Sequence, residues 1–98
     1  MITLNAILRA KPGQADGLAR AIQEIGDYVE ANEPGTVGFY VGHDMEDPLV
    51  FNTYERFVDR AAMDAHNESA YREEWGAKYG GLFDGDITRY ICEEIFSK

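Results

Sequence analysis

The chain has 98 residues, a formal net charge of −9 and a single cysteine, Cys92. The charge argues against nucleic acid and anionic membrane surfaces as partners, because both are bound by clustered Lys and Arg. No apolar run approaches the roughly 20 residues that span a bilayer, the N-terminus lacks the pattern of a signal peptide, and one cysteine excludes an internal disulfide. We therefore expect one cytoplasmic domain over residues 1–98.

The first half of the chain predicts a strand, a helix and a second strand. Residues 2–9 alternate apolar side chains with Thr3, Asn5, Ile7 and Arg9, which is the period of a strand. Lys11-Pro12-Gly13 predicts a turn. Apolar residues recur at helical spacing over residues 14–31, and Pro34-Gly35 ends that helix. Residues 36–43 alternate again as a second strand.

The second half centres on residues 50–75, which hold most of the side chains that could carry chemistry. A strand from Leu49 to Phe57 forms a hairpin with its predecessor, because only a short polar loop joins them. Asp59 can cap a short helix that carries His66 and ends near Asn67. Ser69 opens another helix with an aromatic stripe every four residues, formed by Tyr71, Trp75 and Tyr79. Residues 87–96 alternate as a fourth strand.

This order of elements is the split β-α-β plan of a ferredoxin-like α+β fold, when the two short helices count as one connection. It predicts a four-stranded antiparallel sheet with helices on one face. The strands nevertheless carry large apolar or aromatic residues on both faces, for example Phe39 opposite Tyr40 and Phe51 opposite Tyr54. A sheet face of this kind is usually buried against another protein. We therefore predict a homodimer formed by packing of one sheet on another.

The chain resembles the antibiotic biosynthesis monooxygenase-like domain, a family of dimeric α+β barrels. The resemblance covers about residues 1–80 and lies in the order and spacing of five short segments: Lys11-Pro12-Gly13, Glu33-Pro34-Gly35, Asp47-Pro48, Tyr54-Glu55 and Asp64-Ala65-His66. The family includes small oxygenases that oxidise quinols or polycyclic phenols without metal or flavin, haem-degrading enzymes, isomerases and members without a known activity. The resemblance implies a site for a small aromatic molecule.

The chain departs from the haem-degrading branch of that family at two positions. That branch carries an Asn on the first strand, a Trp on the short helix and a His on the long helix. Here Asn5 matches the first, His66 stands at the second and Trp75 lies near the third. The exchange removes the helix-borne axial histidine, which argues against haem degradation. Tyr54 stands where many members carry Trp near the end of the third strand.

His66 is the first candidate for catalysis, because imidazole exchanges a proton near neutral pH and a phenol must lose a proton before it passes an electron to oxygen. Glu33 could orient His66 if the turn folds back. Asn5 is the second candidate, and we expect it to share a cavity with helix residues. Either side chain could instead be structural and hydrogen-bonded within the core. The candidate substrate-binding residues, each of which could also be core, are Tyr54, Trp75, Tyr71, Phe39, Phe51 and Asn52.

We expect no metal or cofactor. His43 and His66 are too few and too isolated for a metal site, residues 84–86 lack the spacing of a calcium loop, and the chain has no dinucleotide or phosphate-loop motif. The first hypothesis is a cofactor-independent monooxygenase that oxidises a small quinol or phenolic compound, with His66 as the base. The second is a non-catalytic small-molecule-binding dimer. The third is an isomerase or lyase acting on a small carbonyl compound.

Overall fold

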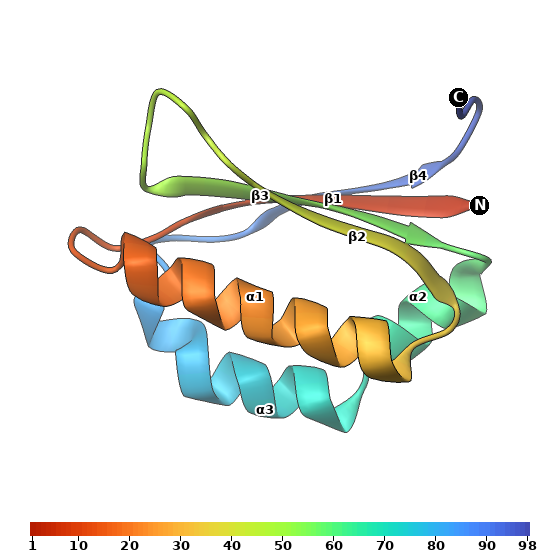
Figure 1. Ribbon diagram of the computed structural model, residues 1–98, viewed down its shortest axis with the longest axis horizontal. Helices are drawn as coiled ribbons and strands as arrows, with labels where there is room; N and C mark the ends of the chain where they lie inside the picture. The colour runs from red at the N-terminus through yellow and green to blue at the C-terminus, as the bar shows by residue number, and fades with distance from the viewer.

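A computed structural model describes residues 1–98 and contains four strands and three α-helices (Figure 1). The strands are β1 (Ile2–Arg9), β2 (Thr36–His43), β3 (Val50–Phe57) and β4 (Thr88–Glu93). The helices are α1 (Ala15–Asn32), α2 (Arg60–Asn67) and α3 (Ala70–Tyr79), followed by a short 3₁₀ helix, η1 (Gly80–Leu82). None of the helices combines the length and apolarity needed to cross a membrane.

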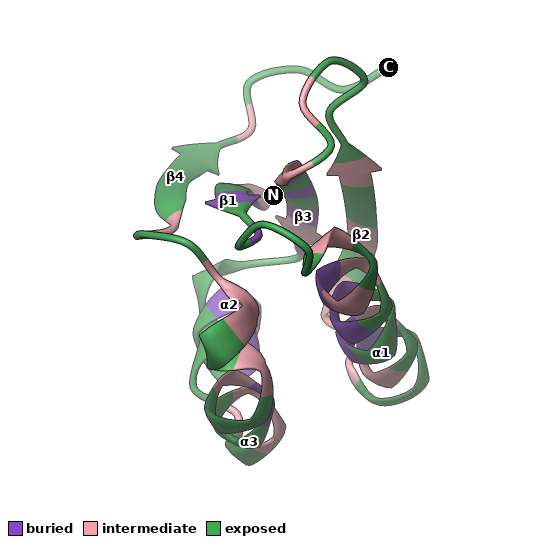
Figure 2. Cartoon of the chain, turned by 90° about the vertical axis from the view of Figure 1, so that its left-hand side faces the viewer, coloured by how far each residue is buried: buried purple, intermediate pink, exposed green.

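The strands form one antiparallel sheet in the order β2-β3-β1-β4, and all the helices lie on the same side of it (Figure 1). The prediction of a ferredoxin-like α+β fold with helices on one face is therefore confirmed. The end-on view in Figure 2 places α1 beneath the β2 edge, with α3 beside it on the same side of the sheet, and α2 contacts β2 and β3.

The core fills the space between the sheet and the helices (Figure 2). Strand β1 contributes Leu4, Ala6 and Leu8, because alternate residues of a strand point to one face. Helix α1 contributes a stripe at spacings of three and four residues, formed by Leu18, Ile22, Ile25 and Val29. Each such side chain stabilises the fold by roughly 1.5–3 kcal/mol relative to an exposed one.

Local capping fixes where α2 and α3 begin. Asp59 accepts a hydrogen bond from the backbone N–H of Ala62 at 2.8 Å, and Ser69 accepts one from the backbone N–H of Arg72 at 3.0 Å. Both caps were predicted from the sequence and are confirmed. Because α2 is only eight residues long, its start at Asp59 also fixes the position of His66 in its last turn.

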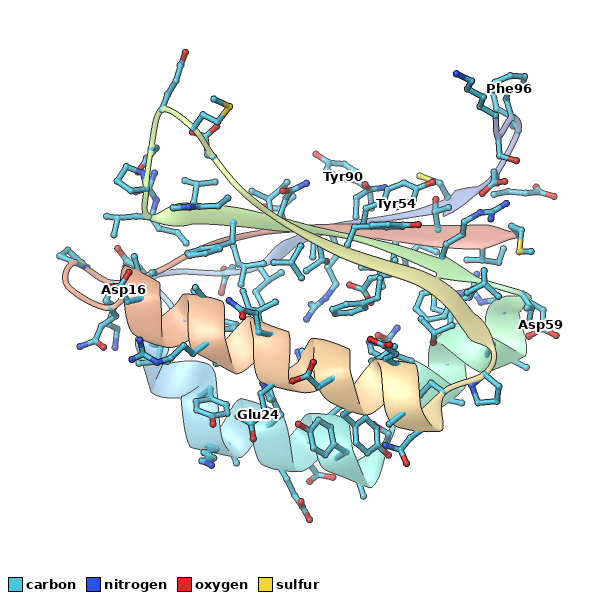
Figure 3. The ribbon with its side chains drawn as sticks, viewed as in Figure 1. Asp16, Glu24, Tyr54, Asp59, Tyr90 and Phe96 are labelled. Carbon is cyan, nitrogen blue, oxygen red and sulfur yellow. The ribbon has the colours of Figure 1, made fainter.

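Strand β4 is shorter than the predicted range of residues 87–96. It ends at Glu93, the Cα partner of Ile2, which is the first residue of β1. Beyond Ile2 there is no strand left for β4 to pair with, so the alternating pattern cannot continue as a sheet. Ile95 and Phe96, which follow, are exposed, and Phe96 lies away from the helices (Figure 3).

The sheet face away from the helices carries one row of side chains contributed by all four strands. The register pairs Tyr40 with Tyr54, Tyr54 with Asn5, and Asn5 with Tyr90. Paired residues share a face, so three tyrosines and Asn5 line up across the sheet. Tyr54 and Tyr90 project from this open face (Figure 3), and Tyr40 is 63% exposed. We refer to Tyr40, Tyr54, Asn5 and Tyr90 as the tyrosine row.

The loop before β2 touches α2 so closely that only glycine fits. A Cβ on Gly35 would lie 2.8 Å from the Cβ of Ala62. We expect Gly35→Ala to push α2 outward and to lower the free energy of unfolding by about 1–3 kcal/mol, measured by urea denaturation. Gly80→Ala is the matched control, because a Cβ there meets nothing within 4 Å. Equal stability of the two variants would contradict this packing.

Candidate functional site

A cavity lies between the sheet and the helices and is lined by fifteen residues, nine of them hydrophobic. Its volume is about 60 Å³. One water molecule needs roughly 10–15 Å³ on this measure, so the enclosed space suits a few waters or one small ring. The polar residues that line it are Thr53, Glu55, His66, Asn67, Arg72 and Arg89. Asn67, Arg72 and Arg89 also line a polar groove on the surface, so the cavity opens there.

His66 lies between two carboxylates that come from distant parts of the chain. Its Nδ1 is 2.7 Å from Glu33 Oε1, and its Nε2 is 3.2 Å from Glu55 Oε1. Glu33 caps the C-terminus of α1, Glu55 lies in the middle of the sheet on β3, and His66 is in the last turn of α2. The suggestion from sequence that Glu33 orients His66 is therefore confirmed.

Two threonines complete this cluster. Thr36 Oγ1 donates to Glu33 Oε1 at 2.9 Å, and Thr53 Oγ1 donates to Glu55 Oε2 at 2.7 Å. His66 and Glu55 are only 4% and 6% exposed, so their charges are almost fully withdrawn from water. Buried charges are stable only when they are paired and hydrogen-bonded. The cluster Thr36–Glu33–His66–Glu55–Thr53 meets that condition.

The surroundings of His66 favour its charged form. Burial alone lowers the pKa of an imidazole, but the hydrogen bonding and charge of Glu55 and the charge of Glu33 outweigh it, so the pKa of His66 lies above its ordinary value of 6.5. Both ring nitrogens are directed at carboxylate oxygens, which accept hydrogen bonds, so the doubly protonated imidazolium satisfies this geometry. In this state His66 holds a proton and cannot accept one directly.

His66 also connects the cavity with a second recess. It lines the cavity together with Glu55, and it lines the recess together with Glu33, Thr36 and Ser69. Glu33 is the more open of the two carboxylates, with 15% of its side chain exposed against 8% for Glu55. A continuous path of titratable groups therefore runs from this recess through His66 to the cavity.

Three of the residues predicted from sequence line the cavity: His66, Trp75 and Phe39. Trp75 is buried, and its Nε1–H donates to the backbone carbonyl of Ala21 at 2.7 Å, which fixes the indole against α1. The Phe39 ring centroid lies 6.0 Å from that of His66. These two aromatic residues form part of the wall beside the charged cluster.

The expectation that Asn5 shares a cavity with helix residues is wrong. Helices cover the Leu4 and Ala6 face of β1, so Asn5 lies on the opposite face, within the tyrosine row. Tyr54 belongs to the same row, with its ring centroid 6.1 Å from that of Tyr40. Asn52 is exposed on this open face and sits beside Gly42. None of these three side chains lines the cavity.

Tyr71 and Phe51 lie on the helix side of the sheet but outside the cavity lining. The Tyr71 ring stacks on Tyr28 of α1, with 3.8 Å between centroids and 1° between planes. Phe51 is buried in the core and stacks on His43 with centroids 4.9 Å apart. Their contacts join elements of the fold. Both residues therefore fit the alternative that they are structural rather than substrate-binding.

Five polar residues of the cavity were not selected as site residues from the sequence: Thr53, Glu55, Asn67, Arg72 and Arg89. The position of Glu55 in the cavity could have been predicted from the sequence. Glu55 occupies the same strand parity as Phe51 and Phe57, so a carboxylate falls on the core-facing side of β3. On β4, Arg89 shares the parity of Ile91, and these two residues pair with Ala6 and Leu4 on the helix side of β1. The structure contains no cluster of three or more His, Cys, Asp or Glu side chains arranged to hold a metal ion.

Comparisons with solved structures define the class of protein. The fold matches the structure of a Caulobacter crescentus protein with a TM-score of 0.91 at 21% identity, covering 97% of this chain and 90% of that chain. It also matches PA3566 from Pseudomonas aeruginosa (TM-score 0.86, 21% identity, 97% and 94% coverage). Rv0793 from Mycobacterium tuberculosis matches as well (TM-score 0.82, 18% identity, 98% and 96% coverage). These likenesses establish a small ferredoxin-like α+β domain.

The sequence places the chain within one family of that class. The sequence model of the family named antibiotic biosynthesis monooxygenase matches residues 1–78. The chain belongs to this family, as the resemblance of its short segments predicted. The Caulobacter crescentus structure carries the same family name. No curated protein matches the chain.

The raised pKa of His66 predicts how stability changes with pH. Below the ordinary value of 6.5 both folded and unfolded chains bind the proton, whereas above it only the folded chain keeps it. The contribution of His66 is therefore full below that value and is lost as pH rises through the raised folded-state pKa, by at most about 1.4 kcal/mol per pH unit. Urea denaturation from about pH 6 to pH 9 measures this slope.

Two variants separate the effect of His66 from that of other groups. His66→Gln should remove this part of the slope, while His43→Gln should keep it, because His43 is exposed and bonds only the Pro48 carbonyl. A wild-type profile that coincides with that of His66→Gln would show that folding does not raise the pKa of His66.

Proposed function

We propose that this chain is a cytoplasmic, cofactor-independent monooxygenase that oxidises a small quinol or phenolic compound with O₂. The observation that carries the proposal is the charged pair of His66 and Glu55 at the wall of a small, largely apolar cavity. Membership of the antibiotic biosynthesis monooxygenase family supports the reaction class. The pair supplies the proton transfers that such a reaction needs.

Glu55 is the group we assign to accept the phenol proton. The sequence alone suggested His66 as that base, but both of its ring nitrogens face carboxylates and its pKa is raised. A phenol in the cavity would donate to Glu55, and His66 would stabilise the transferred proton and pass one on towards Glu33. His66 thus keeps a catalytic role as an acid, and Glu33 acts through it as a positioning residue.

The proposed reaction is balanced without a further reductant. The phenolate transfers one electron to O₂, and the resulting phenoxyl radical and superoxide join through a new carbon–oxygen bond. The peroxide anion formed in this way takes a proton and becomes a hydroperoxide. A base then removes the hydrogen on that ring carbon, the O–O bond breaks to leave a carbonyl, and the departing hydroxide takes a proton to become water. One oxygen atom enters the substrate, which ends as a quinone. The His66–Glu55 pair offers both the base and the acid for these steps.

Oxygen uptake by the purified protein with a panel of quinols and naphthols tests this function. We expect protein-dependent uptake with at least one compound, and a loss of at least about 100-fold in kcat/KM for Glu55→Gln and His66→Gln. Glu33→Gln should lose less, about tenfold, because Glu33 reaches the cavity only through His66. The control is Glu46→Gln, which changes a carboxylate in the exposed loop between β2 and β3.

Uptake that survives Glu55→Gln would remove Glu55 as the base while leaving the reaction. No uptake across the panel would overturn the monooxygenase proposal. The same pair of acid and base could then serve the isomerase or lyase reading, because moving a proton on a small carbonyl compound needs both groups but no oxygen.

We further propose that the open sheet face forms the homodimer expected from the sequence. The tyrosine row and Ile7 expose aromatic and aliphatic surface on the face that no helix covers (Figure 3). Such a face would be expected to carry polar residues if it stayed in water. A second copy packed on it would leave both cavities intact, because the cavity lies on the other side of the sheet.

Sedimentation velocity tests the dimer. Wild type should sediment as a dimer, and the double variant Tyr54→Glu, Tyr90→Glu should sediment as a monomer, because four like charges would meet in the interface. Met45→Glu is the control, since Met45 is 99% exposed at the tip of a loop. A monomeric wild type, or a dimer unaffected by the double variant, would contradict this interface.

A further inference from the structure

The cavity reverses the charge balance of the chain. Acidic residues outnumber basic ones by 18 to 9 in the sequence. Among the residues that line the cavity, however, the charged groups are Glu55 on one side and His66, Arg72 and Arg89 on the other. Glu55 is already paired with His66. The two arginines are therefore an excess of positive charge at one place on an acidic protein.

Neither arginine has a carboxylate partner. Two other arginines do form ion pairs: Arg9 with Asp47 and Arg56 with Glu94, both at 2.7 Å. Arg72 and Arg89 have no carboxylate within 4.0 Å. The Arg72 guanidinium instead lies over the Trp75 ring, 5.0 Å from its centroid. The Glu68 and Glu73 side chains line the outer groove near both arginines but pair with neither.

The two guanidinium groups also lie close enough to repel one another. Arg72 projects from the first turn of α3, and Arg89 projects from β4 on the helix side, opposite Ala6. Both line the cavity and the outer groove, so they meet where the cavity opens. Burial and the neighbouring charge of Arg89 lower the pKa of Arg72, and they outweigh the opposing charge of Glu55. No carboxylate pairs directly with either cation, so an added anionic group would be stabilised between them.

We propose that the substrate carries a carboxylate, which Arg72 and Arg89 bind at the mouth of the cavity. The inference rests on the proposed function and narrows its substrate class to a hydroxylated aromatic carboxylic acid. Guanidinium groups match the planar, two-oxygen geometry of a carboxylate. With the acid group held at the mouth, the ring lies along Trp75 and Phe39, and a hydroxyl at the far end reaches Glu55. The arginines therefore set the orientation of the ring.

A matched pair of ligands tests this without depending on turnover. We would measure the binding of 2,5-dihydroxybenzoate and hydroquinone by isothermal titration calorimetry with oxygen excluded. The two compounds share the ring and both hydroxyls and differ in the carboxylate. Wild type should bind the acid at least about tenfold more tightly. Trp75 is the only tryptophan in the chain and lines the cavity, so quenching of its fluorescence reports binding at this site.

Arginine variants then locate the carboxylate. Arg89→Gln and Arg72→Gln should each reduce the preference for the acid to about threefold or less, with little change in the binding of hydroquinone. Arg89 is exposed on the edge strand, so its variant avoids the loss of packing that Arg72→Gln brings at Trp75. Arg60→Gln, at the exposed start of α2, is the matched control and should keep the full preference.

Equal binding of the two compounds, binding of neither, or a preference that persists in both variants would overturn the proposal. A preference for the acid that depends on the arginines would support it even if no oxygen were consumed, because binding is measured without O₂. Oxygen uptake with uncharged quinols, together with equal binding of the acid and hydroquinone, would support the monooxygenase proposal and contradict the carboxylate site.

Discussion

The imidazolium of His66 between Glu33 and Glu55 is the interaction on which the site and much of the fold depend. It ties the C-terminus of α1 to the centre of the sheet and to the end of α2, three elements that are distant in sequence. Removing such charges from water costs several kcal/mol for each ion, and only close pairing with further hydrogen bonds offsets that cost. Thr36 and Thr53 supply those bonds. A substitution in the cluster therefore changes packing and chemistry together.

The alternation of side chains along the strands explains how much of the candidate site could be predicted from the sequence. Alternation along the strands identified which side chains share a face, and the observed register agrees with it. The misplacement of Asn5 came from choosing the wrong face for the cavity. Leu4 and Ala6 are the apolar side of β1, helices cover apolar sides, and so the polar Asn5 had to face away from them. The same reasoning applied to β3 would have selected Glu55.

The contacts of the aromatic residues on α3 could not be predicted, because the spacing of residues along a helix does not indicate which element packs against it. Tyr71, Trp75 and Tyr79 recur every four residues on α3, yet they differ in surroundings. Tyr71 stacks on Tyr28, Tyr79 bonds Glu24, and only Trp75 reaches the cavity. The distinction depends on how α3 packs beside α1, a tertiary arrangement with no local signature. The contact between Glu33 and His66 likewise required the path of the loop around Gly35.

The net charge of the chain and the charge of its cavity determine different properties of the protein. A net charge of −9 describes solubility and the partners that the outer surface repels. Chemistry depends on the field inside the cavity, where water is scarce and each charge acts more strongly. There the imidazolium of His66 lies beside Glu55, and Arg72 and Arg89 add positive charge to the lining. Fixed positive charge lowers the cost of forming a phenolate before it meets O₂. The positive charge that selects an acidic substrate would therefore also assist its oxidation, so recognition and catalysis in this small cavity would rest on the same electrostatic field.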